Sequence, residues 1–381
     1  MNYLLQRRTT LAQLQKTHGV DAFLVTTPVN VSYLTGFTGE DSYYASVPKH
    51  EIIVSDTRFE GQIAEECGDL EAVIRPHTKT TLEAAADVLT KAGARTVGVE
   101  GNRITLGELE ALKALTPKVT FVPLEGVVEG QRAVKDASEV KRIEDAIRVA
   151  ERAFRMFVAT LREADTEKDM VDALEGYVRR AGGRCSSFPP IVAVGERGAL
   201  PHAPPTAKQL GDGSKLLVDW GADLMYKSDL TRTLKSPFGT APSRRNKMER
   251  VGYRFDDLYK VVLDAQNAAL AAIRPGVKAR EVDAAARKVF ASAQVKGVDL
   301  KLADYFTHGL GHGLGLEVHE APKVRANSED VLEAGMVITV EPGLYLPGWG
   351  GIRIEDDVLV THDGCRLLST LPREPSTLAM I

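Results

Sequence analysis

The stretch LLVDWGADLMYKSDLTRT (216–233) decides how the second half of this chain folds. It contains two apolar, strand-like runs, each with one aspartate, and Asp219 and Asp229 lie ten residues apart. The turn-like ADLMYK separates the runs, so we predict a β-hairpin that brings both carboxylates onto one face. A single aspartate on a strand is usually an edge or turn residue, whereas a pair placed in this way suits a shared pair of metal ions.

Three further metal-type side chains lie in apolar or glycine-rich segments downstream: His312 in HGLGHGLG, Glu341 in VITVEPG and Glu355 in GIRIEDDV. Burying four carboxylates together is costly, because each repels the others and loses its hydration. With His312 neutral, the five groups carry four negative charges, which two divalent cations would balance. We therefore predict a dinuclear metal site, with hydrolysis as its default chemistry.

Histidines support this prediction. His308, His312 and His319 stand in FTHGLGHGLGLEVHEAP (306–322), where alternating glycines oppose an α-helix. We expect the glycines to let an extended backbone approach a ligand closely. A lone histidine, such as His202 in the proline-rich GALPHAPPT, is more often a surface or core residue. An imidazole among carboxylates suits Mn²⁺, Co²⁺ or Zn²⁺ better than Ca²⁺.

An ion pair is the structural alternative for these charges. Arg353 shares a predicted strand face with Glu355, so Arg353 could pair with Glu355 or Asp229. Charged residues are depleted in such β-branched runs unless they are paired or bound to a ligand. One pair would not explain why five such residues occur together.

Composition excludes several classes of protein. The 381 residues are 44% hydrophobic and 26% charged, which is typical of about two globular domains. A net charge of −4 gives no footprint for nucleic acid. Three separated cysteines form no disulfide pattern, and neither a signal peptide nor a membrane span is expected, so we predict a cytoplasmic protein. We interpret the basic run at 243–250 as a surface loop or helix start.

Two halves differ in their patterns. The chain begins with an expected amphipathic helix over 1–18, with Leu4, Leu5, Leu11 and Leu14 on one face. Strand-like and helical runs then alternate up to about residue 125. This alternation predicts an α/β domain with a mainly parallel sheet. Longer helical patterns follow, the first with Ser138 as its expected N-cap and Lys141 leaving the capping box incomplete. Between and after them lie the strands with the five ligands, which predicts an α+β domain with helices covering an antiparallel sheet.

In order and kind, these residues resemble the pita-bread metallopeptidases, the group of methionine aminopeptidase, aminopeptidase P and prolidase, and most of all its proline-specific branch. The motifs span about 185–360, while NVSYLTGFTG (30–39) and VSDTRFEGQI (54–63) resemble the companion domain of aminopeptidase P, prolidase and creatinase. The resemblance implies a creatinase-like N-terminal domain over 1–130, a pita-bread catalytic domain over 131–381, and a homodimer.

The resemblance also implies roles for the site residues. Two divalent metal ions, Mn²⁺ first with Co²⁺ or Zn²⁺ as alternatives, would be bound by Asp219, Asp229, His312, Glu341 and Glu355. Asp229 and Glu355 would bridge both ions, and Glu341 would also act as the general base toward a metal-bridging hydroxide. His319 and His202 would contact the substrate carbonyl. The substrate-binding residues would be His308, Phe188 and Arg353, with Arg353 also supporting the ligands.

The implied activity is a metal-dependent exopeptidase that hydrolyses Xaa-Pro bonds at peptide N-termini, as aminopeptidase P does. A dipeptidase of the prolidase type is the alternative, although prolidases tend to have an arginine where this chain has Lys323, with Arg325 two residues further on. The family usually spaces its two aspartates by eleven residues, with Gly-Tyr before the second; here the spacing is ten and the pair is Met225-Tyr226. We expect a tighter hairpin tip with unmoved ligands.

Two other functions remain open. A creatinase-like hydrolase uses the same fold without metals, but such proteins lose ligands that this chain keeps. An inactive pita-bread binding module would show lost ligands or basic extensions, and neither is present.

Overall fold

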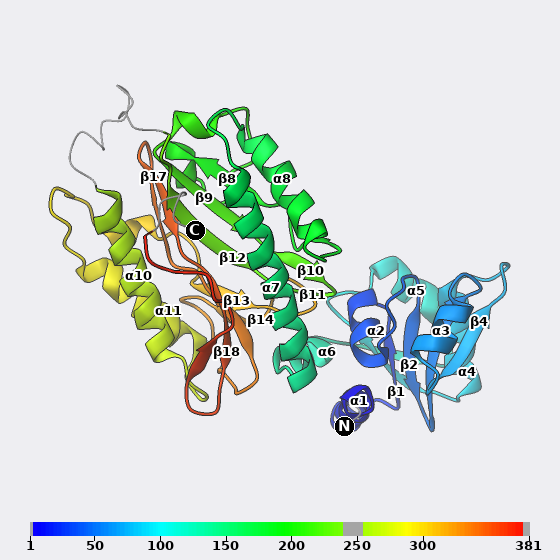
Figure 1. Ribbon diagram of the computed structural model, residues 1–381. Helices are drawn as coiled ribbons and strands as arrows, with labels where there is room; N and C mark the ends of the chain where they lie inside the picture. The colour runs from blue at the N-terminus through cyan, green and yellow to red at the C-terminus, as the bar shows by residue number, and fades with distance from the viewer. Residues whose placement is uncertain (1–2, 239–253, 376–381) are drawn as a thin grey trace. The chain divides into compact units, whose positions relative to one another are not determined.

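The computed structural model describes residues 3–238 and 254–375 (Figure 1). Its internal contacts divide the chain into two compact units, Met1–Arg132 and Ala133–Ile381. Within the described ranges, no helix combines the length and apolar character needed to cross a bilayer. The basic run at 243–250 falls outside these ranges.

The first unit is built on one six-stranded sheet in the order β4-β3-β2-β1-β5-β6. The pairs β1–β5, β5–β6 and β3–β4 are parallel, while β2 is antiparallel to both of its neighbours. The predicted α/β domain with a mainly parallel sheet is therefore confirmed. The strands are β1 (Ala22–Val25), β2 (Tyr43–Val47), β3 (His50–Asp56), β4 (Glu71–Arg75), β5 (Thr96–Glu100) and β6 (Thr120–Leu124).

Helices connect these strands, and sequence signals explain several of their ends. α4 and α5 both begin at a threonine whose hydroxyl accepts from the third helical amide, in complete capping boxes with Glu83 and Glu108. The expected apolar face of α1 is only partly right, because Leu11 is buried but Leu5 is 51% exposed. The helices are α1 (Tyr3–Thr17), α2 (Pro28–Thr35), α3 (Glu60–Glu66), α4 (Thr81–Lys91), α5 (Leu106–Leu115) and α6 (Val127–Ala133).

In the described part of the second unit every strand pairing is antiparallel, as predicted. The sheets are β12-β9-β8, β14-β13-β15-β18-β19, β11-β10-β7 and the hairpin β16-β17. The strands are β7 (Cys185–Ser186), β8 (Ile191–Val194), β9 (Lys215–Trp220), β10 (Ala222–Leu224), β11 (Tyr226–Lys227), β12 (Leu230–Lys235), β13 (Gly311–Gly313), β14 (Glu320–Val324), β15 (Val337–Val340), β16 (Gly343–Leu346), β17 (Gly350–Arg353), β18 (Asp356–Val360) and β19 (Cys365–Leu367).

Two helix pairs cover these strands from outside (Figure 1). α7 (Ala137–Thr160) and α8 (Glu167–Arg180) share one apolar core with β8, β9 and β12, while α10 (Phe255–Ala272) and α11 (Ala279–Ser292) share another with β15 to β18. Phe154 of α7 stacks on Trp220 of β9 with ring centroids 4.1 Å apart. Short 3-10 helices η1 (Gly195–Ala199), η2 (Leu210–Asp212) and η3 (Leu302–Tyr305) complete the unit. The strands are thus enclosed by helices, which confirms the predicted pita-bread architecture.

The N-cap predicted for α7 is wrong by two residues. Asp136, rather than Ser138, caps the helix, and its carboxylate accepts hydrogen bonds from the amides of Ser138 and Glu139. The Asp136 amide in turn donates to the Glu139 carboxylate, so the capping box is complete. Ser138 instead donates its hydroxyl to the same aspartate.

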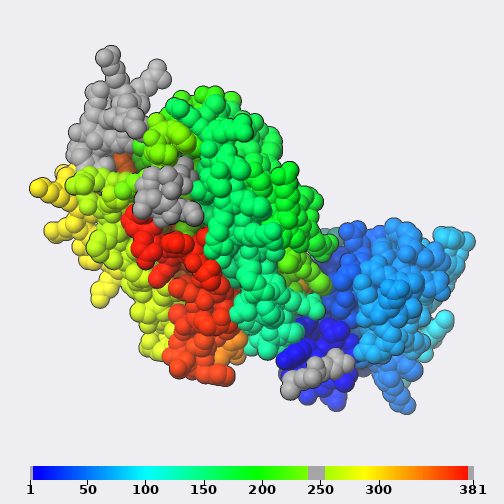
Figure 2. All heavy atoms as spheres, viewed as in Figure 1, coloured from blue at the N-terminus to red at the C-terminus, as the bar shows by residue number. Residues whose placement is uncertain are grey.

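The C-terminal segment packs alongside α7, where Figure 2 shows red residues beside the green helix. Arg366 bonds to Glu144 at 2.9 Å, and the Glu151 carboxylate accepts from the amides of Thr370 and Leu371. Beyond this contact, Arg232 of β12 donates to the carbonyls of Leu371 and Pro372. The end of the described chain is therefore bound to α7 and to β12.

Candidate metal centre

The predicted hairpin carries both aspartates. Asp219 is the penultimate residue of β9 and lies opposite Thr231 of β12, while Asp229 immediately precedes β12. Gly221 lies where the two arms of the hairpin approach closely, since a Cβ there would sit 1.8 Å from the Ser228 carbonyl oxygen. Burial and register therefore bring the two carboxylates close together, near enough for the charge of Asp219 to raise the pKa of Asp229.

The hairpin tip is tight, as its shortened spacing predicts. Leu224 lies opposite Tyr226, which leaves Met225 alone at the turn with a φ of 81°. Non-glycine residues seldom adopt this left-handed conformation, so a glycine would fit this position without strain. The Met225 amide donates to Asp223, which helps to hold the turn.

His312 and Glu341 come from neighbouring strands of the larger sheet. His312 lies in β13, and Glu341 follows β15 directly. The Nδ1 atom of His312 lies 3.1 Å from the Gly313 carbonyl, so Nδ1 carries the proton and Nε2 keeps its lone pair. Nε2 lies 3.6 Å from Asp229 and 3.5 Å from Glu341. Burial lowers the pKa of His312 to about 4, which keeps the ring neutral and able to bind a metal ion.

Two glycines beside His312 let neighbouring strands approach closely. A Cβ on Gly311 would lie 2.1 Å from the Thr339 carbonyl oxygen, and one on Gly313 would lie 2.0 Å from that of Ala321. The glycines therefore let β13 fit between β14 and β15. The expectation that they also let the backbone approach a ligand stays a prediction.

Glu355 lies between β17 and β18 and is tied to the hairpin. Its amide donates to the Thr231 carbonyl at 3.1 Å, and the Thr231 hydroxyl donates to its carboxylate at 2.6 Å. Among the described residues, the ligand atoms of Asp229, His312 and Glu355 lie within 4.8 Å of one another, a spacing that could hold a metal ion. Glu341 lies against His312 at the edge of this group.

Arg353 pairs with Asp219, not with Glu355 or Asp229 as the ion-pair alternative supposed. Its Nη2 lies 2.5 Å from Asp219 Oδ2. The buried guanidinium also donates to the hydroxyls of Thr231 and Tyr345 and to the Pro201 carbonyl. These contacts make Arg353 a support for Asp219, and its predicted contact with substrate stays a prediction.

Burial dominates the electrostatics of the carboxylates. It raises the pKa of Asp219, and it raises that of Glu341 to about 8, with Arg353 opposing and the charge of Asp219 adding to the rise. Burial and neighbouring carboxylates also raise the pKa values of Asp229 and Glu355 well above their ordinary range. Arg353 contributes one compensating positive charge, which the predicted charge balance did not count. The set still has a deficit of positive charge.

The donor set fits divalent metal ions. Asp219 Oδ1 is buried with no hydrogen-bond partner among the described residues, although its other oxygen is held by Arg353. A buried, unpaired carboxylate oxygen is costly unless a cation faces it. Oxygen ligands with one neutral imidazole suit Mn²⁺, Co²⁺ and Zn²⁺.

The other three histidines predicted for the site, His202, His308 and His319, lie near this centre. The rings of His312 and His319 meet edge to face, with centroids 4.3 Å apart, and His319 is exposed. Exposed His202 lies near enough to Asp219 and His319 for its charge to lower the pKa of each. Burial, with the nearby charge of Arg353, lowers the pKa of His308 to about 4.

Tyr345 and Thr339 support the site and were missed by the sequence analysis. The Tyr345 hydroxyl accepts from Arg353 and lies 2.7 Å from His308 Nε2, while His308 Nδ1 lies 2.7 Å from the Gly309 carbonyl. The Thr339 hydroxyl accepts from the His312 amide. Thr339 lies two residues before Glu341, so strand alternation could have placed both on one face; Tyr345 carried no such signal.

Phe188, Lys323 and Arg325 are the other residues for which a role toward substrate is predicted. Phe188 is half-buried three residues before Ile191, which pairs with Asp219 across β8 and β9. Lys323 of β14 lies opposite His312 in the register and is exposed, as is Arg325. Their roles toward substrate stay predictions.

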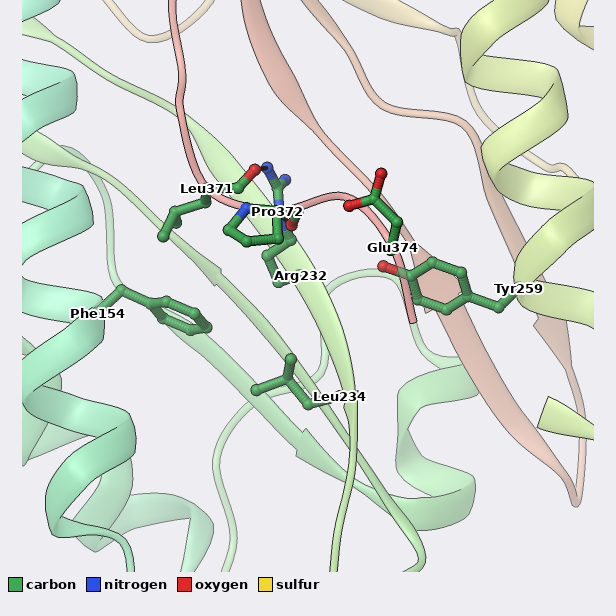
Figure 3. Close-up of a pocket in the computed structure, with 7 residues that line it drawn as sticks. All are labelled: Phe154, Arg232, Leu234, Tyr259, Leu371, Pro372 and Glu374. Carbon is green, nitrogen blue, oxygen red and sulfur yellow. Dashed lines mark hydrogen bonds between the residues drawn. The ribbon is translucent and has the colours of Figure 1, made fainter. Parts of the chain in front are cut away.

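A small cavity lies on the opposite side of β12, lined by Phe154, Arg232, Leu234, Tyr259, Leu371, Pro372 and Glu374 (Figure 3). Strand alternation points Arg232 and Leu234 away from the face that bears Thr231. The cavity volume is about 10 Å³, far below the ~300–1,000 Å³ typical of ligand pockets. It is therefore part of the packing behind the centre.

Comparisons with known proteins agree with this geometry. Residues 141–362 match metallopeptidase family M24, and residues 7–134 match the creatinase/prolidase N-terminal domain. An uncharacterized peptidase of Bacillus subtilis, YqhT, is 36% identical over 357 residues, covering 93% of this chain and 95% of that protein.

Two solved structures are similar over nearly their whole length. An Xaa-Pro dipeptidase from Bacillus anthracis has a TM-score of 0.87 and 32% identity, with 98% of this chain and 99% of that chain covered. An X-Pro aminopeptidase from Thermotoga maritima has a TM-score of 0.83 and 31% identity, with 96% and 99% covered.

Proposed function

Because this chain belongs to metallopeptidase family M24, we propose that it is a metal-dependent exopeptidase that hydrolyses Xaa-Pro bonds at peptide N-termini. The observation that carries the proposal is the convergence of Asp229, His312 and Glu355 within 4.8 Å, next to Glu341 and Asp219. Solved relatives that act on Xaa-Pro peptides support this substrate class.

The centre would hold two divalent ions, of which Mn²⁺ is our first choice and Co²⁺ or Zn²⁺ are alternatives. Their ligands would be Asp219, Asp229, His312, Glu341 and Glu355. Bound metal ions polarise a carbonyl group and make water a competent nucleophile near neutral pH. The unpaired Asp219 Oδ1 and the raised pKa values of its neighbours support this assignment.

Glu341 would move the proton. Its Oε1 faces His312 and Thr339, so Oε2 takes the proton of the attacking water and returns it to the proline nitrogen as the peptide bond breaks. His319 and His202 donate hydrogen bonds to the substrate carbonyl oxygen and stabilise its developing charge. Their exposed rings, near buried Asp219 and His312, support this placement.

Substrate length separates two versions of the function. Lys323 replaces the arginine typical of dipeptide-specific relatives, which favours longer peptides and an activity like aminopeptidase P. The similarity to an Xaa-Pro dipeptidase favours the second version, with Lys323 or Arg325 binding the carboxylate of a dipeptide. Lys323 lies opposite His312 in the register of β13 and β14, which also supports this second version.

We also propose a cytoplasmic homodimer. The three cysteines are free, in keeping with a reducing compartment. The dimer rests on the family resemblance alone, and sedimentation of the purified protein tests it.

The decisive experiment offers Ala-Pro and Ala-Pro-Ala to Mn²⁺-loaded enzyme and identifies products by mass spectrometry. Alanine released mainly from the tripeptide supports the aminopeptidase, and alanine released mainly from the dipeptide supports the dipeptidase. Cleavage of neither peptide by protein that has bound metal would overturn the proposal and favour a creatinase-like hydrolase or a binding module.

A further inference from the structure

We propose that Glu167, the first residue of α8, is a positioning residue that holds the loop 195–206 and thereby places His202 at the metal centre. The inference rests on the proposed function, in which His202 contacts the substrate carbonyl. Glu167 lies 28 positions before the first residue of this loop, and its side chain is fully buried. Glu167 is not one of the five proposed metal ligands, and it has no predicted role in contacting substrate.

Among the described residues, the Glu167 carboxylate accepts five hydrogen bonds, all from the borders of this loop or from the loop itself. The Val194 amide donates to Oε1 at 2.9 Å, at the point where β8 ends. The Thr206 amide and hydroxyl donate to Oε2 at 2.9 and 2.6 Å, where the loop ends. Arg197, within the loop, donates its Nε to both oxygens at 3.0 and 2.8 Å. One carboxylate thus joins the start, the interior and the end of the segment.

Arg197 extends this attachment toward His202. Its Nη2 donates to the Pro204 carbonyl at 2.5 Å, two residues after the histidine. On the other side of the histidine, Arg353 donates to the Pro201 carbonyl at 3.4 Å while it holds Asp219. The backbone on both sides of His202 is therefore fixed, although its own ring is exposed.

Packing gives the loop a second support. Ala203 is buried in a small apolar cluster with Ala193 and Leu217, which lies two residues before Asp219 on β9. A Cβ on Gly198 would lie 3.0 Å from the Gly351 amide, so the loop also fits closely against β17. His202 is the residue of this segment whose ring can face the centre, and its charge acts on Asp219, His308 and His319.

We call the hydrogen bonds of Glu167 and Arg197 to the loop 195–206 the frame of His202, and this frame matters for catalysis. A hydrogen-bond donor to a developing oxyanion must lie within a few tenths of an ångström of its best position, because it acts without reorganisation. An exposed histidine on a proline-rich loop would otherwise sample many positions. Glu167 replaces that freedom with a fixed backbone, so its loss should weaken the contribution of His202 more than the fold.

The chain offers a matched control. Glu151 of α7 is also a buried glutamate that accepts from two backbone amides and one threonine hydroxyl, here those of Thr370 and Leu371, and Arg155 lies 3.6 Å away. It holds the C-terminal segment instead of the loop. Glu167→Gln and Glu151→Gln therefore make the same chemical change at comparable burial, and only the first touches the frame of His202.

The test is a double-mutant cycle on metal-loaded enzyme with the better of the two alanyl-proline peptides. We expect Glu167→Gln to lower kcat/KM by about 10–100-fold, the range typical for residues that orient an active-site group. In a His202→Ala background the same change should cost less than about twofold, because the two residues act through one contact. Glu151→Gln should cost the same factor in both backgrounds. An equal loss from Glu167→Gln in both backgrounds would overturn the proposal.

Hydrogen exchange gives a readout that needs no activity. Amides of 195–206 should exchange faster in Glu167→Gln than in wild type, and at the wild-type rate in Glu151→Gln. Unchanged exchange in Glu167→Gln would also overturn the proposal. If wild type cleaves neither peptide, the proposed function fails, and this measurement alone decides whether Glu167 fixes the loop.

A second variant covers a failure to fold. Arg197→Met breaks the same frame from the loop side, at a residue that is 22% exposed. It should show the same coupling to His202→Ala and the same faster exchange, and additive losses would count against the proposal.

Discussion

Glu355 and Asp356 are neighbours in the chain, yet they meet opposite surroundings. Glu355 faces the metal centre, where Glu341 and Asp219 add to the burial that raises its pKa. Asp356 faces the packing behind the centre and is bonded by Arg232 at 2.7 Å, Gln266 at 2.8 Å and Ser369 at 2.5 Å. Both are 1% exposed, so burial alone does not distinguish them. The difference is whether the protein supplies the compensating charge.

The same division holds for other carboxylates of the second unit. Glu167 and Glu151 accept several hydrogen bonds each and have an arginine nearby. Asp229 and Glu341 instead face other carboxylates and a neutral imidazole. Buried charges without partners are unfavourable, so the centre is a place where the fold leaves room for cations to complete it.

The largest expected effect is the loss of a centre ligand. Asp229→Ala should lower kcat by more than ~100-fold, beyond the ~10–100-fold that loss of an outer partner usually costs, because it removes a proposed ligand of both metal ions. Metal analysis by plasma mass spectrometry should show less bound metal. Asp356→Asn is the control from the compensated group and should retain its metal. Near-normal turnover by a metal-free Asp229→Ala enzyme would contradict the claim that cations complete the carboxylates of the centre.

Two buried arginines test this division between compensated and uncompensated carboxylates. Arg232→Met leaves Asp356 without its cation and should destabilise the protein by about 3–5 kcal/mol whether or not metal is bound. Arg353→Met should cost clearly less in metal-loaded protein than in metal-free protein, since bound cations also compensate Asp219. Urea denaturation of each variant with and without Mn²⁺ measures this. Equal metal dependence for both variants would contradict the division.

The pH dependence of metal-free stability follows from the raised pKa values. Between its ordinary value of 4.5 and about 8, Glu341 keeps a proton in the folded state that the unfolded chain has released. Folding stability should therefore fall as pH rises from 6.5 to 8, by about 1.4 kcal/mol per pH unit for each such group. Below pH 6.5 the lowered pKa values of His308 and His312 act in the opposite direction, because the unfolded chain then binds protons that the folded histidines do not. Thermal unfolding of metal-stripped protein from pH 6.5 to 8 tests this, and loading with Mn²⁺ should reduce the fall. A metal-free Tm that rises over this range would contradict the prediction.

The smallest effect concerns the hairpin tip, away from the ligands. Met225→Gly relieves a positive φ but adds freedom to the unfolded chain, so we expect a net gain of roughly 0.5–1 kcal/mol with unchanged kcat. Lys49→Gly, at a φ of 70° in the turn between β2 and β3, is the matched control and should gain a similar amount. A change in metal affinity in Met225→Gly would show that the tip conformation affects the ligands.

Much of the fold could be predicted because its signals are local. Period-two alternation and capping residues indicate strands and helix starts without knowledge of the rest of the chain. The error at the start of α7 occurred where two local signals competed, and the packing at the glycines beside His312 was decided by distant strands. Asp136 replaced Ser138 as a cap because it binds two helical amides. Gly311 and Gly313 are explained by Thr339 and Ala321, which no local pattern connects to them.

For the site, the sequence by itself determined which side chains are available: carboxylates and histidines inside apolar or glycine-rich runs, where they are costly unless bound to something. Only the tertiary structure decided which of them the protein compensates. Arg353 reaches Asp219 across 134 residues, and Arg232 reaches Asp356 across 124. Such pairings depend on how strands from distant parts of the chain are stacked. The physical reason is that charge compensation acts through space, while sequence patterns report only neighbours along the chain.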